Sequence, residues 1–136
     1  MTEKAVVPQI AHTGESADNT VLLRGRVTTA PVERELPSGT VISAFRISVP
    51  RARTSMTAGS AQGVDWVDCT AWNARCRRSV SRWAVGDLVE VTGALRRRYV
   101  RAGPGSTRLE VEVLGARRSG GRTSPAQPAG VREAAP

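Results

Sequence analysis

The sequence predicts an all-β fold: a small five-stranded barrel with one short helix between the third and fourth strands. Two observations lead to this prediction. Apolar and polar side chains alternate in five separate stretches, which is the period of a strand with one face on a core. Turn signals rich in glycine or proline separate several of these stretches, and only one segment has helical spacing instead.

The chain is expected to begin with a flexible extension over residues 1–18, followed by strands at residues 20–28 and 40–49. A turn signal, Pro37-Ser-Gly39, lies between these two strands. Their alternation places one set of aliphatic side chains in the core and leaves the opposite set toward solvent. The basic residues of that opposite set are Arg24, Arg26 and Arg46.

Residues 50–63 form a long polar loop without periodicity, and loops of this length in a small domain are usually functional or disordered. Residues 65–72 follow as the third strand. Their core side is small and apolar, and their solvated side carries Trp66, Asp68, Thr70 and Trp72. At strand rise the two indole rings are about 20 Å apart. Large exposed aromatic residues are uncommon without a ligand, and in a basic chain the ligand that this face favours is a nucleobase.

A short helix is expected after Asn73, a residue type that caps helix N-termini, and Gly86 is expected to end it. Helical spacing gives a buried stripe of Cys76, Val80, Trp83 and Ala84. The outer face of the same segment carries Arg75, Arg78 and Arg82.

The fourth strand is predicted at residues 87–99 and the fifth at residues 108–114, with Gly103-Pro-Gly105 as the hairpin between them. In the fifth strand, alternation puts Leu109, Val111 and Val113 inward and Glu110 and Glu112 outward. From Arg117 onward the composition is typical of a disordered basic tail.

Five strands with one helix between the third and fourth is the element order of the OB-fold. This barrel binds oligonucleotides on the face of its second and third strands and on the adjoining loops. The predicted organisation is therefore one OB-fold domain over residues 19–117, between an extension (1–18) and a basic tail (118–136).

The net charge of +8 favours a polyanionic partner. Two cysteines, Cys69 and Cys76, are too few for a disulfide framework, and we expect both as buried reduced thiols in a cytoplasmic, nucleoid-associated protein. A single histidine offers no metal site, and no apolar run reaches the length of a membrane span. We expect no cofactor and no enzymatic activity, because no nucleophile or acid–base set accompanies Asp65 and Asp68.

Several segments together resemble the bacterial single-stranded-DNA-binding protein family over roughly Asn19–Arg117. They are, in order, Asn19-Thr-Val-Leu-Leu-Arg-Gly-Arg-Val27, Pro31-Val-Glu-Arg34, Phe45-Arg-Ile47, Trp66-Val-Asp-Cys-Thr-Ala-Trp72 and Val85-Gly-Asp-Leu-Val-Glu-Val-Thr-Gly93. The resemblance implies non-enzymatic binding of single strands during replication, repair or recombination, and usually a homotetramer.

The chain departs from the family pattern in three places. Arg51 and Arg53 stand where the family often has an aromatic residue, and Tyr99 lies one position before another such site. The chain ends Val131-Arg-Glu-Ala-Ala-Pro136, whereas many members end in an acidic tip that recruits repair enzymes. We therefore expect a paralogue that does not recruit such enzymes through a tip.

The predicted interface combines rings that stack on bases with guanidinium groups that bind phosphates. Its members are Trp66, Trp72, Arg24, Arg26, Arg46, Arg51, Arg53, Arg96, Arg98, Tyr99 and Arg101. Two alternatives stay open at this point. One is an OB-fold protein that binds RNA, and the other is an adaptor that hetero-oligomerises with a principal single-strand binder.

Overall fold

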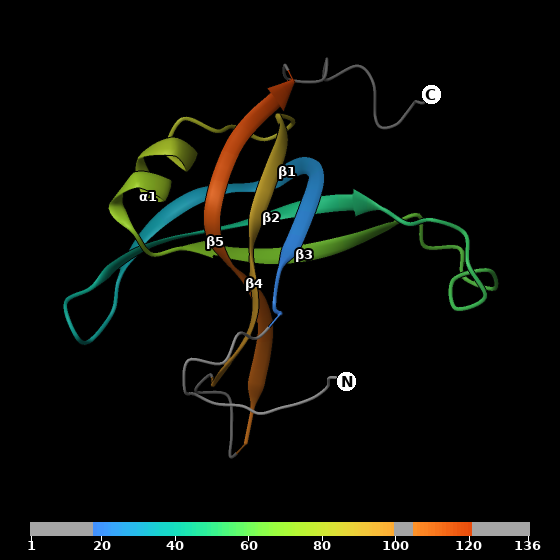
Figure 1. Ribbon diagram of the computed structural model, residues 1–136, viewed down its shortest axis with the longest axis horizontal. Helices are drawn as coiled ribbons and strands as arrows, with labels where there is room; N and C mark the ends of the chain where they lie inside the picture. Colours follow the sequence, from blue (N-terminus) through green and yellow to red (C-terminus); the bar gives the residue numbers. More distant parts are fainter. Residues whose placement is uncertain (1–17, 100–104, 121–136) are drawn as a thin grey trace, which may run out of the picture.

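The computed structural model describes residues 18–99 and 105–120, which form a closed five-stranded barrel (Figure 1). The elements in chain order are β1 (Val21–Glu35), β2 (Val41–Pro50), β3 (Val64–Ala71), α1 (Ala74–Val80), β4 (Leu88–Tyr99) and β5 (Thr107–Gly120). The strand order around the barrel is β1-β2-β3-β5-β4, with β4 pairing back onto β1. The predicted fold class, with its helix between the third and fourth strands, is confirmed.

The core is filled by the inward side chains of all five strands together with α1. Val27, Ile47, Val89 and Val113 are almost completely buried, as alternation predicts. The ring of Phe45 meets a tryptophan ring edge-to-face, with centroids 5.3 Å apart and planes at 86°. That tryptophan is Trp83, which is buried as predicted.

The helix is shorter than the sequence predicts. Asn73 caps its start as expected, its Oδ1 accepting the backbone N–H of Cys76 at 2.8 Å. The C-cap, however, is Ser81, so Trp83 lies beyond the helix instead of within it. Gly86, with φ of 98°, does not end the helix but forms the turn into β4, a conformation that glycine adopts without strain.

Strand β1 continues seven residues beyond the predicted end at Thr28. Its first half pairs with β4 and its second half with β2, because one strand must serve two neighbours when a barrel closes. Two register shifts, between Val27 and Thr29 and between Thr29 and Val32, mark where it bends. The segment from Pro31 to Arg34 is therefore part of the strand.

Strand β5 runs to Gly120, so the prediction of a disordered tail from Arg117 is wrong for the first four tail residues. Arg117 and Arg118 pair in register with Glu90 and Val89 of β4. Backbone pairing overrides a composition that is poor in strand-forming residues. The rest of the predicted tail, like the N-terminal extension and the tip of the β4–β5 hairpin, lies outside the described residues.

Two inward–outward predictions on β5 are wrong. Leu109 is 53% exposed, whereas Glu110 is buried at 5%. The reason is that β4 pairs with β1 only as far as Gly93, and β5 pairs with β3 only from Val111. Toward their hairpin, these two strands leave the barrel wall and have no core behind Leu109.

Thr70 on β3 is also buried, at 2%, although alternation places it on the solvated side. It has register partners on both flanks, Ala44 of β2 and Glu112 of β5, so neighbouring strands shield its small side chain.

Candidate nucleic-acid interface

Two indole rings are exposed along β3, one from Trp66 within the strand and one from Trp72, the residue that follows it. Trp66 is 58% exposed and Trp72 is 38% exposed, while the intervening Cys69 and Ala71 face the core. This separation follows from the alternation of a strand whose inner side chains are small enough for a tight barrel. The rings are available to a ligand, and their stacking on bases stays a prediction.

An ion pair occupies the space between the two tryptophan positions. Arg46 of β2 donates from Nε to Oδ1 of Asp68 across the strand pair, at 2.8 Å. The hydrogen bond to Asp68, and secondly its charge, raise the pKa of Arg46, which therefore stays protonated. The guanidinium remains half-exposed, so it can bind a second anion.

A row of side chains crosses three strands at the level of Trp66. The register pairs Arg26 of β1 with Ser48 of β2, and Ser48 with Trp66 of β3. Register partners share a face, so Arg26 lies on the same outer surface as the ring. Its Nη1 donates to the backbone oxygen of Gly86 at 3.1 Å.

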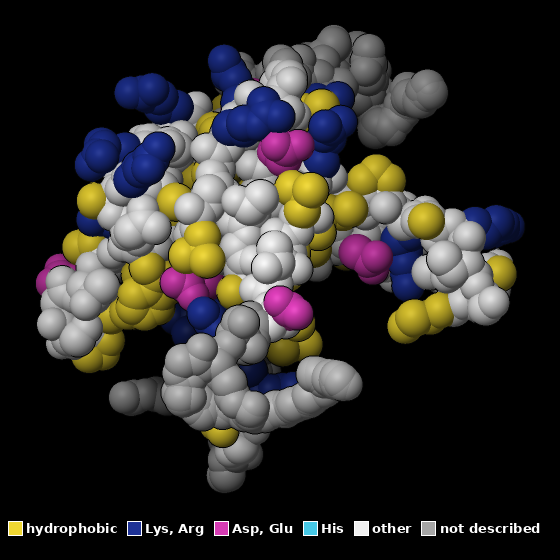
Figure 2. Space-filling model, in the orientation of Figure 1, with side chains coloured by type: hydrophobic (Ala, Val, Ile, Leu, Met, Phe, Trp, Pro, Cys, Tyr) yellow, Lys and Arg dark blue, Asp and Glu magenta, His cyan; other side chains and the backbone are white. Residues whose placement is uncertain are grey.

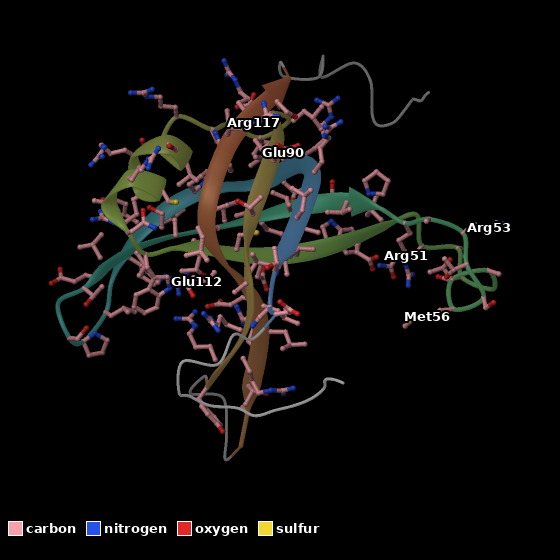
Figure 3. All side chains as sticks on the ribbon, in the orientation of Figure 1. Arg51, Arg53, Met56, Glu90, Glu112 and Arg117 are labelled. Carbon is pink, nitrogen blue, oxygen red and sulfur yellow. The ribbon has the colours of Figure 1, made fainter. Side chains whose placement is uncertain are left out.

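Arg24 lies on this face too and meets Glu90 of β4, with Nη2 and Oε2 3.4 Å apart. The same carboxylate receives Arg117 of β5 on its other oxygen, at 2.9 Å. Figure 3 shows Glu90 and Arg117 side by side at the upper end of the barrel. Glu90 thus joins two arginines across β1, β4 and β5.

The long loop between β2 and β3 projects from the barrel and carries Arg51, Arg53 and Met56 (Figure 3). Arg51 Nε lies 3.3 Å from Oδ2 of Asp65, yet its N–H does not point at an acceptor. Arg53 is exposed and has no ion pair or side-chain hydrogen bond within the described residues. The loop therefore offers one weakly held and one free guanidinium.

The predicted phosphate-binding arginines of β4, Arg96 and Arg98, lie beside carboxylates of β5. Arg96 donates to Glu112 at 2.9 Å, and Arg98 Nε lies 3.0 Å from the buried Glu110. A buried carboxylate needs such a countercharge, so Arg98 stabilises the buried Glu110 in the folded protein. Phosphate binding by Arg96 and Arg98 stays a prediction.

Tyr99 is 78% exposed at the end of β4. It alternates with Arg98 and shares its face with Arg97, whose Nη1 donates to Thr107, the register partner of Tyr99. Tyr99 therefore lies on the opposite face of the hairpin from Arg96 and Arg98. Arg101 lies outside the described residues.

The sequence analysis missed the carboxylates as partners of the predicted arginines. Asp65 directly precedes Trp66, and Asp68 lies between the two tryptophans. Their partners come from earlier in the chain, Arg51 from the residue after β2 and Arg46 from β2 itself. Only the strand register brings them together. No group of metal-ligating side chains occurs within residues 18–99 and 105–120, and no described helix is long and apolar enough to cross a bilayer.

A closed OB barrel with exposed tryptophans and flanking arginines on its outer face defines a class of proteins that bind nucleic-acid strands. Residues 18–118 match the single-strand binding protein family, and the chain belongs to this family. Membership confirms the resemblance seen in the sequence, and the family is one of single-strand binding proteins.

Curated relatives include the single-stranded DNA-binding protein of Bacillus cereus, 28% identical over 96 residues that cover 71% of this chain and 55% of the relative. Single-stranded DNA-binding protein A of Bacillus subtilis is 27% identical over 95 residues, covering 70% and 54%. The chain thus spans about half the length of the curated relatives it matches.

Solved structures with the same fold include the Plasmodium falciparum SSB complex with ssDNA, at a TM-score of 0.61 and 18% identity, covering 76% of this chain and 95% of that one. The small single-stranded DNA-binding protein from Streptomyces coelicolor has a TM-score of 0.55 and 24% identity, with coverage of 73% and 90%. At these identities the likeness concerns the fold.

Proposed function

We propose that this protein binds single-stranded DNA with little sequence preference, through bases stacked on Trp66 and Trp72 and phosphates held by the flanking arginines. The observation that carries the proposal is the outer face of β3, where two exposed indole rings flank the Arg46–Asp68 ion pair. Indole stacking is tolerant of sequence because every base has a π-face.

In the proposed mechanism, phosphate groups replace carboxylates as partners of the arginines. Arg46 and Arg51 are held near Asp68 and Asp65 in the free protein, so their guanidinium groups are already positioned. Planar guanidinium forks bind phosphate oxygens as well as carboxylates, so the exchange conserves hydrogen bonds. Displaced counterions then favour binding at low salt.

The test is intrinsic fluorescence during titration with oligo-dT. Stacking should quench Trp66 and Trp72, while Trp83, buried in the core, supplies a constant background. The double variant Trp66→Ala, Trp72→Ala should lose about 1–3 kcal/mol for each stacked base. Full affinity in that variant would assign both rings a structural role.

Val85→Ala is a suitable control, because Val85 is an exposed apolar residue, at 56%, that lies outside the proposed interface. Its affinity should equal that of the wild type. Competition between matched DNA and RNA oligonucleotides separates the proposal from an RNA-binding function, which the fold also permits.

The proposal includes a homo-oligomer, usually a tetramer in this family, that acts on DNA in the cytoplasm during replication, repair or recombination. It is supported by exposed aliphatic side chains on β1, β4 and β5, namely Leu22, Leu95, Leu109 and Leu114. Mass measurement by light scattering tests it, and a monomer at micromolar concentration would contradict it. Mixing with a principal single-strand binder would reveal an adaptor as a hetero-oligomer.

A further inference from the structure

Five arginines gather outside the predicted interface, along α1, the turn after it, and the C-terminal end of β5. They are Arg75, Arg78, Arg82, Arg117 and Arg118, and we call them the helix-side basic surface. Figure 2 shows dense basic side chains over α1 and the end of β5, with few acidic ones among them.

Much of this positive charge is not neutralised by the protein. Arg75, Arg78 and Arg82 are exposed, and none of their side chains has an ion pair or hydrogen bond within the described residues. On the tryptophan face, by contrast, Arg46 and Arg51 each have an aspartate partner. The strongest attraction for a polyanion is therefore expected on the helix side.

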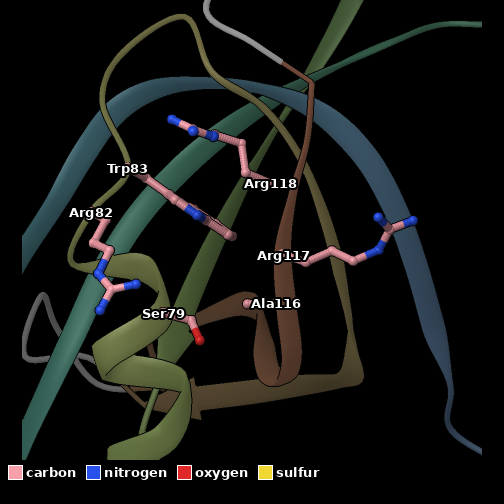
Figure 4. A pocket seen from close by; sticks show the side chains of 6 residues that line it. All are labelled: Ser79, Arg82, Trp83, Ala116, Arg117 and Arg118. Atoms are coloured by element: carbon pink, nitrogen blue, oxygen red, sulfur yellow. The ribbon is translucent and has the colours of Figure 1, made fainter.

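The helix-side basic surface contains a pocket of about 360 Å³ between α1 and β5 (Figure 4). Its lining residues are Ser79, Arg82, Trp83, Ala116, Arg117 and Arg118. None of these described lining residues is a carboxylate. Guanidinium groups and a hydroxyl are the donors that bind phosphate oxygens in nucleic-acid complexes.

The cations of this pocket differ in how firmly they are held. Arg117 donates to Glu90 at 2.9 Å, whereas Arg118 Nη1 is 3.8 Å from Oδ2 of Asp87, beyond hydrogen-bond distance. Arg82 has no partner within the described part of the chain. Arg82 and Arg118 are thus the guanidinium groups most available to an entering anion.

The helix-side basic surface adjoins both ends of the tryptophan strand. At one end, Arg26 lies in the same row of side chains as Trp66, and its guanidinium donates to the backbone oxygen of Gly86. The next residue, Asp87, lies near Arg118. At the other end, Arg77 of α1 donates to the backbone oxygen of Trp72 at 3.4 Å. A nucleic-acid strand that crosses β3 would therefore meet basic side chains at both ends of β3 and could continue onto this surface.

We propose that the helix-side basic surface binds the phosphates of single-stranded DNA beyond the nucleotides stacked on Trp66 and Trp72, with the pocket holding one phosphate group. This inference rests on the proposed function. It predicts that DNA strands long enough to extend beyond the two tryptophans bind more tightly, and with a steeper salt dependence, than short DNA strands. An acidic peptide is the other polyanion that the charges would attract, but the continuity with β3 favours a nucleic-acid strand.

The experiment compares the variant Arg82→Gln, called the helix-side variant, with the control Arg34→Gln. Both arginines are exposed and have no partner within the described residues, so neither variant leaves a carboxylate unpaired, and both lose the same charge. Each is titrated with dT oligonucleotides of about 6 and about 20 nucleotides, the first near the low end of the usual range for one OB-fold and the second above it.

The helix-side variant should bind the short oligonucleotide like the wild type. For the long one, the magnitude of its slope of log affinity against log salt should fall by about 0.7, the value for one phosphate contact. The control should change neither. Equal losses in both variants would indicate bulk charge, and unchanged long-strand binding in the helix-side variant would also overturn the inference.

Two further outcomes are informative. If poly-glutamate binds the wild type and loses binding in the helix-side variant while DNA affinity stays unchanged, the surface binds acidic peptides and the inference is wrong. Failure of the short oligonucleotide to quench tryptophan fluorescence would instead contradict the proposed function itself.

Discussion

Asp68 is an acidic side chain in the middle of a surface that is proposed to bind a polyanion. It accepts from Arg46 at 2.8 Å and keeps that guanidinium in place between the two tryptophans. The carboxylate therefore both positions the arginine and competes with phosphate for it. This balance is expected to make binding weaker and more readily reversed than the arginine alone would.

Removing the charge of Asp68 should tighten binding. In Asp68→Asn the side chain keeps its size, but Arg46 no longer has an anionic partner and phosphate meets no repulsion. Because the pair is solvent-exposed, the expected gain in oligo-dT affinity is modest, roughly two- to fivefold at low salt. Fluorescence titration measures it, and a weaker complex would mean that positioning matters more than competition.

Cys69 shows how the same carboxylate acts through the sheet. Burial raises the pKa of its thiol from 9.0 to about 12, and the charges of Asp68 and Glu110 add to the rise. Between pH 9 and 12 the unfolded chain releases this proton while the folded chain retains it. The contribution of this thiol to the free energy of unfolding is therefore fully present below pH 9 and decreases as the pH rises toward 12.

Urea unfolding at pH 8 and pH 10.5 tests this titration. The wild type should lose more stability between the two values than Cys69→Ala, which lacks the titrating thiol. A thiol reagent at pH 8 should modify Cys69 only after unfolding, because the side chain is buried. Equal pH dependence in the two proteins would show that other groups dominate.

Strand β4 is the element on which barrel closure depends, because it pairs with β1 on one side and β5 on the other. Beyond Gly93 its pairing with β1 ends, and the Asn19 side chain takes over that edge. The Asn19 amide donates to the oxygen of Leu95 and accepts its N–H, both at 2.9 Å. One side chain thereby supplies the two hydrogen bonds that a neighbouring strand would make.

Gly93 lies at a register shift between β4 and β5. A Cβ at this position would collide with the backbone oxygen of Glu112. Gly93→Ala should therefore destabilise the barrel by about 1–3 kcal/mol in urea unfolding.

Gly59→Ala is the matched control, since a Cβ at Gly59 meets nothing within 4 Å. Its stability should stay within about 0.5 kcal/mol of the wild type. Equal stability of the two variants would mean that the β4–β5 contact relaxes without cost.

At the scale of the whole molecule, charge is distributed unevenly around the barrel. The net charge is +8, but Arg46 and Arg51 on the tryptophan face are paired with aspartates, whereas several exposed arginines along α1 and the turn after it have no partner within the described residues. A ligand drawn by charge and held by stacking would therefore contact two different surfaces.

This division predicts how binding responds to salt. Affinity for long oligo-dT should fall steeply between about 50 and 200 mM salt, because each phosphate contact releases counterions. Affinity of the Trp66→Ala, Trp72→Ala variant should be lower at every salt concentration but should fall with a similar slope. Titrations at four salt concentrations measure both, and a flat dependence in the wild type would contradict electrostatic attraction.

The sequence by itself determined the barrel, the position of the helix and the exposure of Trp66 and Trp72. Alternation and capping are local patterns, and a strand's inner and outer faces follow from them wherever a core lies behind it. The same local rules were wrong at Leu109 and Glu110, because these residues lie where β4 and β5 extend past the core.

Only the tertiary structure decided which charges meet. The partners Arg46–Asp68 and Arg98–Glu110 come from different strands, and their contact depends on register, which no single strand contains. The pocket between α1 and β5 likewise requires β5 to run past Leu114, which its pairing with β4 makes possible and its composition does not indicate. Long-range pairing, and not local preference, therefore sets the electrostatics of this surface.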